Sequence, residues 1–404
     1  MKIDIIQIRR GITKLRVFLK RKIVICLLLI FIIGFAVMVG IWLNSANPTI
    51  GIVYSDTYAK KYGLNIEGAV SNLVLQNTID YDNIFIKEST GDMSSAFECI
   101  ETLAAIKCDV IVVICDNSID AVQQAATEYN KIIFCTFGEE KQNSSVYSNV
   151  KGFNFAVHEL RYVNGYLAGL KLKEMADNEQ IDKGKQIIGY IADERTPENI
   201  SAYSAMYLGA RAANKDIKLY VKYIDNQIVH DKTAKVLIAN GCNLIALQDS
   251  NEDVRTICSK NNIAYSEFGD VPDNEQLISH MNCRLESYLL YIIDCKKEKK
   301  EISDGWCGGF NTDSLSISIS QGDIFNNHDE IQTQIDELTE RLRDSSLKVF
   351  DTSTWTVSGK KIKSALSGDG SGTEYINPGG YFAEGEISPN PQFAFKIDGI
   401  EILK

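Results

Sequence analysis

The chain has 404 residues, 45% of them hydrophobic and 24% charged, which is ordinary globular composition in a chain long enough for two domains with separate cores. Its formal net charge is −11, and eight basic residues lie within the first 22 positions, so the remainder of the chain is more acidic still. Binding to nucleic-acid phosphates requires a basic surface, so a nucleic-acid role is excluded.

The amino-terminal segment predicts a membrane anchor. Residues 1–22 form a basic cytoplasmic head, and residues 23–43 contain no charged side chain. A helix of about 20 apolar residues spans a bilayer. Because Lys and Arg precede this helix and are absent from 44–59, we expect a single pass through the cell membrane, with the N-terminus inside and the body extracytoplasmic. A cleaved signal peptide is the alternative, although the apolar run is longer than the roughly 7–15 residues usual in such peptides.

Nine of the ten cysteines follow the predicted anchor, and none belongs to a C-x-x-C pair. Their spacing therefore excludes zinc-ribbon and thioredoxin-like sites. Most lie within apolar runs, where cysteine behaves as a small hydrophobic residue, and an odd number cannot pair completely. We therefore expect reduced thiols.

From residue 48 onward, strand-like and helix-like segments alternate along the chain. Amphipathic stretches predict helices at 96–107, 120–129, 160–176, 201–213 and 233–240. Short apolar runs rich in Val, Ile and Phe predict buried strands at 49–54, 83–87, 110–115, 131–137, 187–191, 218–223, 243–247 and 263–268. Repeated β-α-β units indicate an α/β fold with parallel sheets that are covered by helices on both faces.

These units are too many for one sheet, so we expect two lobes. The rhythm is interrupted near 151–155, before a long helix, and a polar stretch containing proline at 270–275 suggests a return crossing. We therefore assign residues 48–153 to the first lobe, with 272–310 returning to it. The second lobe takes 154–271, with 311–404 as a C-terminal extension.

Motifs for catalysis, metals and cofactors are missing. The four histidines are scattered, and the chain has no H-E-x-x-H, no G-x-S-x-G and no phosphate-binding loop. The first predicted strand is not followed by the G-x-G-x-x-G fingerprint of dinucleotide binding. We therefore predict that the protein is not an enzyme and has neither a cofactor nor a metal site.

In open α/β sheets, ligands bind outside the carboxyl ends of the strands. The residues that follow the predicted strands are accordingly the candidates for contact with a small-molecule ligand, although such residues also commonly cap the next helix. These candidates are Asp56, Asp116, Asn117, Glu139, Asp193, Asp249, Gly269 and Asp270.

Residues 161–175, with the sequence RYVNGYLAGLKLKEM, resemble the R-x-x-x-G-x-x-A-G segment of the basic membrane protein (BMP) family. This family comprises substrate-binding lipoproteins of ABC importers of the purine-nucleoside type. Further similar runs follow in the same order, namely IGYIA at 188–192, SAMYLGAR at 204–211, LIANGCNLI at 237–245, LKVFDTSTWTV at 347–357 and IDGI at 397–400.

The resemblance implies a type I periplasmic-binding-protein fold, with two Rossmann-like lobes joined by a hinge, here preceded by one N-terminal transmembrane helix. In the family, an acid and an aromatic residue after the first strand hold the ribose and stack on the base, and Asp56 and Tyr62 are the nearest matches. The usual Asp-Lys-Ser-Phe-Asn pattern is absent. Where the family often has an acid that reads the base, this chain has Phe137, with Glu139 two positions on.

The resemblance thus predicts a membrane-anchored solute-binding component of an ABC importer, specific for a purine nucleoside or a similar small polar ligand. Its expected partners are an ABC permease and ATPase, and its expected mechanism is closure of the lobes around the ligand. The alternative is a membrane-tethered sensory or regulatory module of the same fold that no longer binds nucleoside. The altered ligand loops and the helical anchor, in place of a lipid-modified cysteine, favour that alternative.

Overall fold

The computed structural model describes residues 34, 47–138, 147–224, 229–248, 250–269, 271–322, 324–368 and 370–404. Within these ranges, no helix has both the length and the apolar character needed to cross a membrane. The predicted head at 1–22 lies outside the described residues, as does the predicted anchor at 23–43 apart from Gly34.

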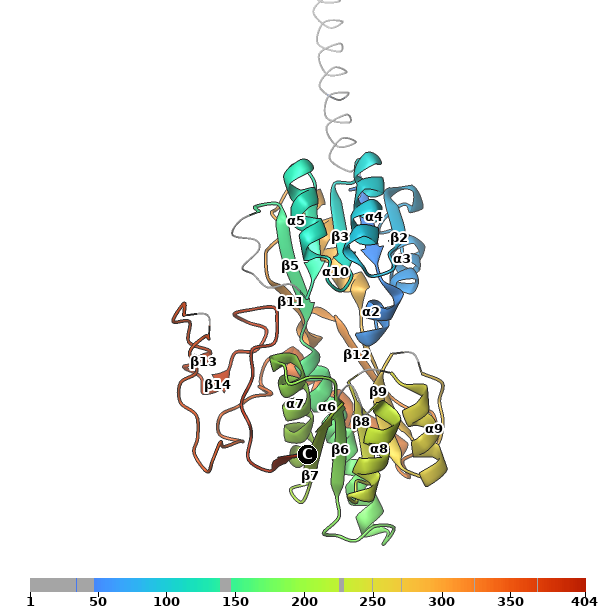
Figure 1. Ribbon diagram of the computed structural model, residues 1–404, viewed down its shortest axis with the longest axis vertical. Helices are drawn as coiled ribbons and strands as arrows, with labels where there is room; N and C mark the ends of the chain where they lie inside the picture. The colour runs from blue at the N-terminus through green and yellow to red at the C-terminus, as the bar shows by residue number, and fades with distance from the viewer. Residues whose placement is uncertain are drawn as a thin grey trace, which may run out of the picture.

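The first lobe, at the top of Figure 1, is built on a six-stranded sheet in which all neighbouring strands are parallel. In spatial order the strands are β11 (Trp306–Gly308), β5 (Val150–Phe155), β4 (Ile133–Phe137), β3 (Val110–Ile114), β1 (Ile50–Tyr54) and β2 (Ile84–Glu88). The central strand β3 is buried along its whole length, as expected of a parallel strand with helices on both faces. The helices of this lobe are α2 (Asp56–Lys61), α3 (Ile66–Leu75), α4 (Met93–Ala105), α5 (Ile119–Glu128) and α10 (Leu285–Lys297), with the 3-10 turn η1 (Tyr81–Asn83).

The second lobe is built on a seven-stranded sheet that is parallel except for one edge strand, β12. In spatial order the strands are β12 (Leu315–Ile319), β10 (Leu277–Cys283), β9 (Ala264–Phe268), β8 (Leu244–Leu247), β6 (Ile187–Ala192), β7 (Lys218–Tyr223) and β15 (Ile400–Ile402). The helices of this lobe are α6 (Val157–Asp177), α7 (Pro197–Ala213), α8 (His230–Ala239), α9 (Glu252–Asn261) and α11 (His328–Arg343).

Glycines in the family-like segments allow helices α6 and α7 to pack closely against each other. A Cβ atom added at Gly165 of α6 would lie 2.0 Å from the carbonyl oxygen of Met206, and one added at Gly209 of α7 would lie 1.9 Å from that of Tyr162. Both distances are far below van der Waals contact, so only glycine permits this approach of the two backbones. The glycine spacing of the R-x-x-x-G-x-x-A-G segment is therefore explained by the close packing of α6 on α7.

The predicted return to the first lobe at residue 272 is placed too early. Strand β10 pairs with β9 inside the second sheet, so the chain returns near Arg284, where α10 begins. The polar stretch at 270–275 is a loop between two strands of one lobe. The chain crosses between the lobes at three places, after β5, after β10 and after β11, where the 3-10 turn η2 (Phe310–Thr312) leads to β12.

After α11 the chain forms an extension beside the second lobe, drawn in red in Figure 1. It contains the short antiparallel pair β13 (Ile376–Asn377) and β14 (Tyr381–Phe382) and ends as β15 on the edge of the second sheet. Its core is aromatic, with the rings of Phe350 and Phe393 stacked at 3.9 Å and Trp355 edge-on to Phe393. Across the part of the chain that the structure describes, the nine cysteines are free thiols.

Candidate functional site

A cavity of about 530 Å³ lies between the two lobes. The first lobe contributes the end of β1, helix α2 and the start of α3, and the second lobe contributes the segments after β8 and β9. The cavity therefore lies at the carboxyl ends of parallel strands, where ligands bind in open α/β sheets. Its volume falls within the range of about 300–1,000 Å³ that is typical of small-molecule sites.

The first-lobe wall of the cavity is rich in oxygen acceptors. Asp56, the first residue of α2, is half-exposed and forms an ion pair of 2.6 Å with Lys60 one turn later. Glu67 lies in the first turn of α3, and Tyr54 ends β1. Burial raises the pKa of the Tyr54 phenol, and the charges of Glu88, Glu67 and Asp56 raise it further. This wall can accept hydrogen bonds from hydroxyl or amine groups of a ligand.

The second-lobe wall contains a fixed arginine. Nη1 of Arg255 donates to the Ser250 hydroxyl at 2.8 Å and to the two carboxylate oxygens of Glu267 at 3.0 and 3.1 Å. Glu267 is 0% exposed and also accepts a hydrogen bond of 2.9 Å from the backbone N–H of Asn251. Burial raises the pKa of Glu267, while its hydrogen bonds to Asn251 and Arg255 oppose that change.

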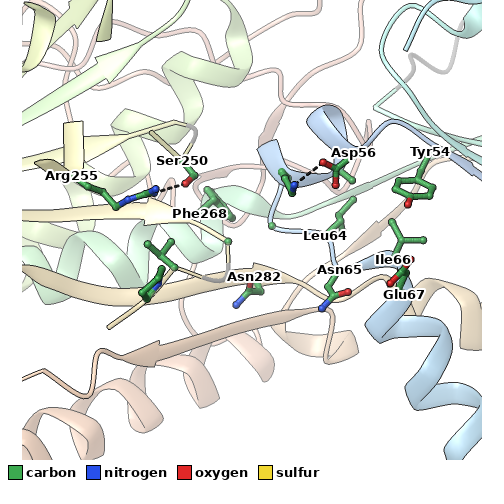
Figure 2. Close-up of a pocket in the computed structure, with 16 residues that line it drawn as sticks. Tyr54, Asp56, Leu64, Asn65, Ile66, Glu67, Ser250, Arg255, Phe268 and Asn282 are labelled. Atoms are coloured by element: carbon green, nitrogen blue, oxygen red, sulfur yellow. Dashed lines mark hydrogen bonds and ion pairs between the residues drawn. The ribbon is translucent and has the colours of Figure 1, made fainter. Parts of the chain in front are cut away.

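Figure 2 shows how the two walls face each other. Arg255 and Ser250 lie on one side, Tyr54, Asp56 and Glu67 lie on the other, and Phe268 and Asn282 lie between them. Phe268 is almost fully buried, and the guanidinium carbon of Arg161 lies 4.5 Å from the centre of its ring.

Two of the predicted site residues, Asp56 and Gly269, line this cavity. Gly269 has a φ of +97°, which favours glycine, and a Cβ added there would meet no atom within 4 Å, so it leaves the cavity open. Glu139, Asp249 and Asp270 lie outside the described residues.

Tyr62 and Phe137 belong to an aromatic cluster next to the cavity. The Tyr62 ring lies edge-on to Phe137 at 4.8 Å and to Tyr58 at 5.3 Å, and both Tyr62 and Phe137 are buried. Burial raises the pKa of Tyr62 well above its ordinary value, and the charge and hydrogen bond of Glu198, in the first turn of α7, raise it further. The Tyr62 hydroxyl of the first lobe therefore lies near the Glu198 carboxylate of the second.

Asp193 also makes a contact between the lobes. Its carboxylate lies 3.9 Å from the ammonium of Lys61 in the first lobe and 3.6 Å from Nε2 of His230 in the second. By contrast, Asp116 and Asn117 are exposed in the turn after β3, where Asp116 accepts a hydrogen bond from the Asn117 N–H and Asn117 has a φ of 52°. The described candidate residues therefore lie in three places. Asp56 and Gly269 line the cavity, whereas Tyr62, Phe137 and Asp193 lie beside it, where protein groups contact one another. Asp116 and Asn117 lie in an exposed turn.

The C-terminal extension reaches the first lobe on the side of the aromatic cluster. The Asn390 amide donates to the carbonyl oxygen of Gly138, directly after Phe137, and accepts from the Asn154 amide, both at 3.0 Å. We call the set of Lys61, Tyr62, Phe137, Asp193, Glu198 and Asn390, with their partners, the packed side of the interlobe space.

Sequence reasoning missed several residues of the cavity. Phe268 could have been found, because it ends a predicted strand. Ser250 directly follows the candidate Asp249 and belongs to the same polar segment after a predicted strand. Glu67, Arg255 and Asn282 gave no such signal. Arg255 lies one turn into a helix, and Asn282 lies on a strand that the sequence analysis did not predict.

Two lobes joined by three crossings, with a ligand-sized cavity between them, define the class of periplasmic-binding-protein-like folds. Within that class, the chain belongs to the family described as ABC transporter substrate-binding protein PnrA-like (Bmp), whose sequence model matches residues 56–268, more than half of the chain. This is a family of substrate-binding proteins that take small molecules and work with a permease and an ATPase.

Solved structures share the fold. An ABC transporter solute-binding protein from Conexibacter woesei matches with a TM-score of 0.57 at 15% identity, covering 74% of this chain and 97% of that one. A transcriptional activator of the comK gene from Bacillus halodurans matches with a TM-score of 0.56 at 14% identity, covering 74% and 99%. A solute-binding protein from Aeropyrum pernix matches with a TM-score of 0.54 at 12% identity, covering 75% and 93%. At these identities the likeness concerns the fold alone.

Proposed function

We propose that this chain is the membrane-anchored, extracytoplasmic solute-binding component of an ABC importer and that it binds a purine nucleoside or a similar small polar ligand. The observation that carries the proposal is the 530 Å³ cavity between the lobes, with acceptors on one wall and donors on the other. A nucleoside has donors in its ribose hydroxyls and acceptors along the edge of its base, so it can satisfy both walls at once.

Lobe closure is the proposed mechanism. Both lobes line the cavity, so a ligand that contacts both walls stabilises the closed arrangement over an open one by its difference in affinity for the two. The permease would then recognise the closed form. The packed side supports this proposal, because it supplies contacts between the lobes that an open form would lose.

Isothermal titration calorimetry on the full-length chain in detergent, with inosine, guanosine, adenosine and ribose as ligands, tests the proposal. We expect saturable binding of at least one nucleoside and much weaker binding of ribose alone. If no nucleoside binds, the proposal is wrong, and the regulatory module becomes the better hypothesis.

Anchoring by residues 23–43 has a separate test. Protease added to intact cells should degrade the body of the protein and leave a small membrane-bound fragment. A mature N-terminus near residue 46 would instead show that the segment is cleaved.

A further inference from the structure

We propose that Arg255 determines which nucleosides the cavity accepts, by presenting hydrogen-bond donors that select a 6-oxopurine over a 6-aminopurine. This inference rests on the proposed function and goes beyond it, because it names the chemical edge of the ligand that the second lobe recognises.

Ser250 and Glu267 use only some of the N–H donors of Arg255. All of its hydrogen bonds to Ser250 and Glu267 are made by Nη1, and across the described residues its Nε–H and Nη2–H groups have no partner. Its side chain is 25% exposed and lines the cavity. A guanidinium offers five N–H donors in a rigid planar fork, so the remaining donors are available to a ligand.

The arginine is also held in place before a ligand arrives. Glu267 lies behind it, fully buried and fixed by the N–H of Asn251, and the Ser250 hydroxyl gives a second contact. A side chain that is already ordered loses little rotamer freedom when it binds a ligand. Such an arginine discriminates between ligands better than a flexible lysine would.

The charges around the cavity favour a neutral ligand over an anion. Glu267 offsets the positive charge of Arg255, and on the opposite wall Lys60 offsets only Asp56, which leaves Glu67 unbalanced. A phosphate or carboxylate ligand would thus meet a net negative cavity. A neutral ligand with carbonyl acceptors can use the donors of Arg255 without that repulsion.

The two walls also set the orientation of the ligand. Ribose hydroxyls donate to the carboxylates of Asp56 and Glu67, so the base points toward Arg255 in the second lobe. A 6-oxopurine then presents two acceptors, O6 and N7, which match the fork of an arginine. Adenosine places its amino group at position 6, where donor would face donor.

Calorimetry with inosine and adenosine on the full-length chain tests the inference. We expect inosine to bind about 5- to 140-fold more tightly, which corresponds to the roughly 1–3 kcal/mol of a good bidentate pair. In the double variant Arg255→Met with Glu267→Gln, which avoids leaving a buried carboxylate unpaired, the ratio should fall to near one. The single variant Ser250→Ala retains the ion pair and should reduce the ratio only in part.

The matched control is Arg284→Met. Arg284 also pairs with a glutamate, Glu286, at 2.9 Å, but it lies outside this cavity, so its loss should leave the ratio unchanged. A purely structural role for Arg255 would weaken both ligands equally and lower the melting temperature without changing the ratio. Equal affinities in the wild type, or a preference for adenosine, would overturn the inference while the proposed function stands. If neither nucleoside binds, both fail together.

Discussion

Helix α2 borders two different halves of the space between the lobes. Asp56 and Lys60 face a cavity, whereas Lys61 and Tyr62, at the end of the same helix, contact the second lobe directly. On the cavity side, within the described residues, no hydrogen bond or ion pair joins Asp56 or Glu67 of one wall to Arg255 of the other. On the packed side, ion pairs, a phenol, an aromatic cluster and the amide of Asn390 fill the space with protein groups.

The difference indicates a division of roles. The packed side provides polar contacts between the lobes that need no ligand, and the proposed ligand would supply such contacts on the cavity side. Under the proposed lobe closure, the position of the open–closed equilibrium would depend on both sides, and a ligand would add only its own differential affinity for the closed form. Residues of the packed side should therefore affect stability and closure, and residues of the cavity should affect ligand choice.

The largest effect on the packed side should come from Glu384, which holds the segment that carries Asn390. Its buried carboxylate accepts hydrogen bonds from the Ser201 hydroxyl in α7 and from the backbone N–H groups of Gln392 and Phe393. Glu384→Ala leaves these donors buried without a partner, so we expect the free energy of unfolding to fall by about 3 kcal/mol or more. Urea denaturation measures it, and Glu384→Gln, which retains an acceptor oxygen, should lose much less. Equal losses in the two variants would contradict this account.

The same carboxyl group should make stability depend on pH. Burial raises the pKa of Glu384 to about 7 and that of Glu159, at the start of α6, to about 7 as well. A folded-state pKa above the unfolded value means that the folded protein binds more protons than the unfolded chain. The stabilisation that comes from these protonated carboxyl groups is therefore present at low pH and is lost as pH rises through 7. We expect the contribution of Glu384 to the free energy of unfolding to fall between about pH 5 and 7, by up to about 3 kcal/mol. Burial lowers the pKa of His158 to about 3, so its contribution rises up to about pH 6.5 and opposes this fall. The difference between the wild type and Glu384→Gln isolates the Glu384 contribution, and a difference that stays constant between pH 5 and 7 would contradict the prediction.

On the cavity side, Asp56→Ala should weaken nucleoside binding about ten- to a hundred-fold. A hydrogen bond from a ribose hydroxyl to a charged carboxylate contributes about 1.5–3 kcal/mol, and 1.4 kcal/mol corresponds to tenfold. Stability should change little, because the pair with Lys60 is solvent-exposed. Calorimetry measures the affinity, with Asp329→Ala in α11 as a silent control. An unchanged affinity would remove Asp56 from the site.

Asp193→Asn should have a smaller effect, through closure. The variant keeps the shape of the side chain but removes the ion pair with Lys61, a partly exposed pair worth less than about 1 kcal/mol. We expect affinity to fall by no more than about fivefold, and by less at high salt, where the wild-type pair is itself screened. Asp231→Asn is the matched control, since its pair with Lys235 lies within one helix. A loss that is equally large at high and at low salt would indicate direct ligand contact instead.

The sequence predicted the α/β fold because buried parallel strands are short apolar runs, and β3 and β4 are readily recognised in this way. It missed β10, whose residues LISHMNC mix polar and apolar side chains, and the lobe boundary was misplaced as a result. The rule for the carboxyl ends of strands found Asp56 and Gly269 but not Arg255, which reaches the cavity from within a helix. Local sequence also could not predict which residues line the cavity and which belong to the packed side. Lys60 lines the cavity, whereas its neighbour Lys61 pairs with Asp193 on the packed side.

Tyr62 provides the smallest expected effect and the sharpest test of that separation. In Tyr62→Phe the ring still packs on Phe137, and only the hydroxyl near Glu198 is lost. Glu198 is partly exposed and can be hydrated instead, so the loss should lie near 0.5 kcal/mol, or about a twofold change in affinity. Because the hydroxyl of the first lobe lies near a carboxylate of the second, small-angle scattering should show a slightly larger radius of gyration in the ligand-free variant. Tyr58→Phe, in the same cluster, is the comparison variant. A tenfold loss of affinity with unchanged ligand-free scattering would mean that Tyr62 contacts the ligand itself, and the aromatic cluster would then belong to the binding site.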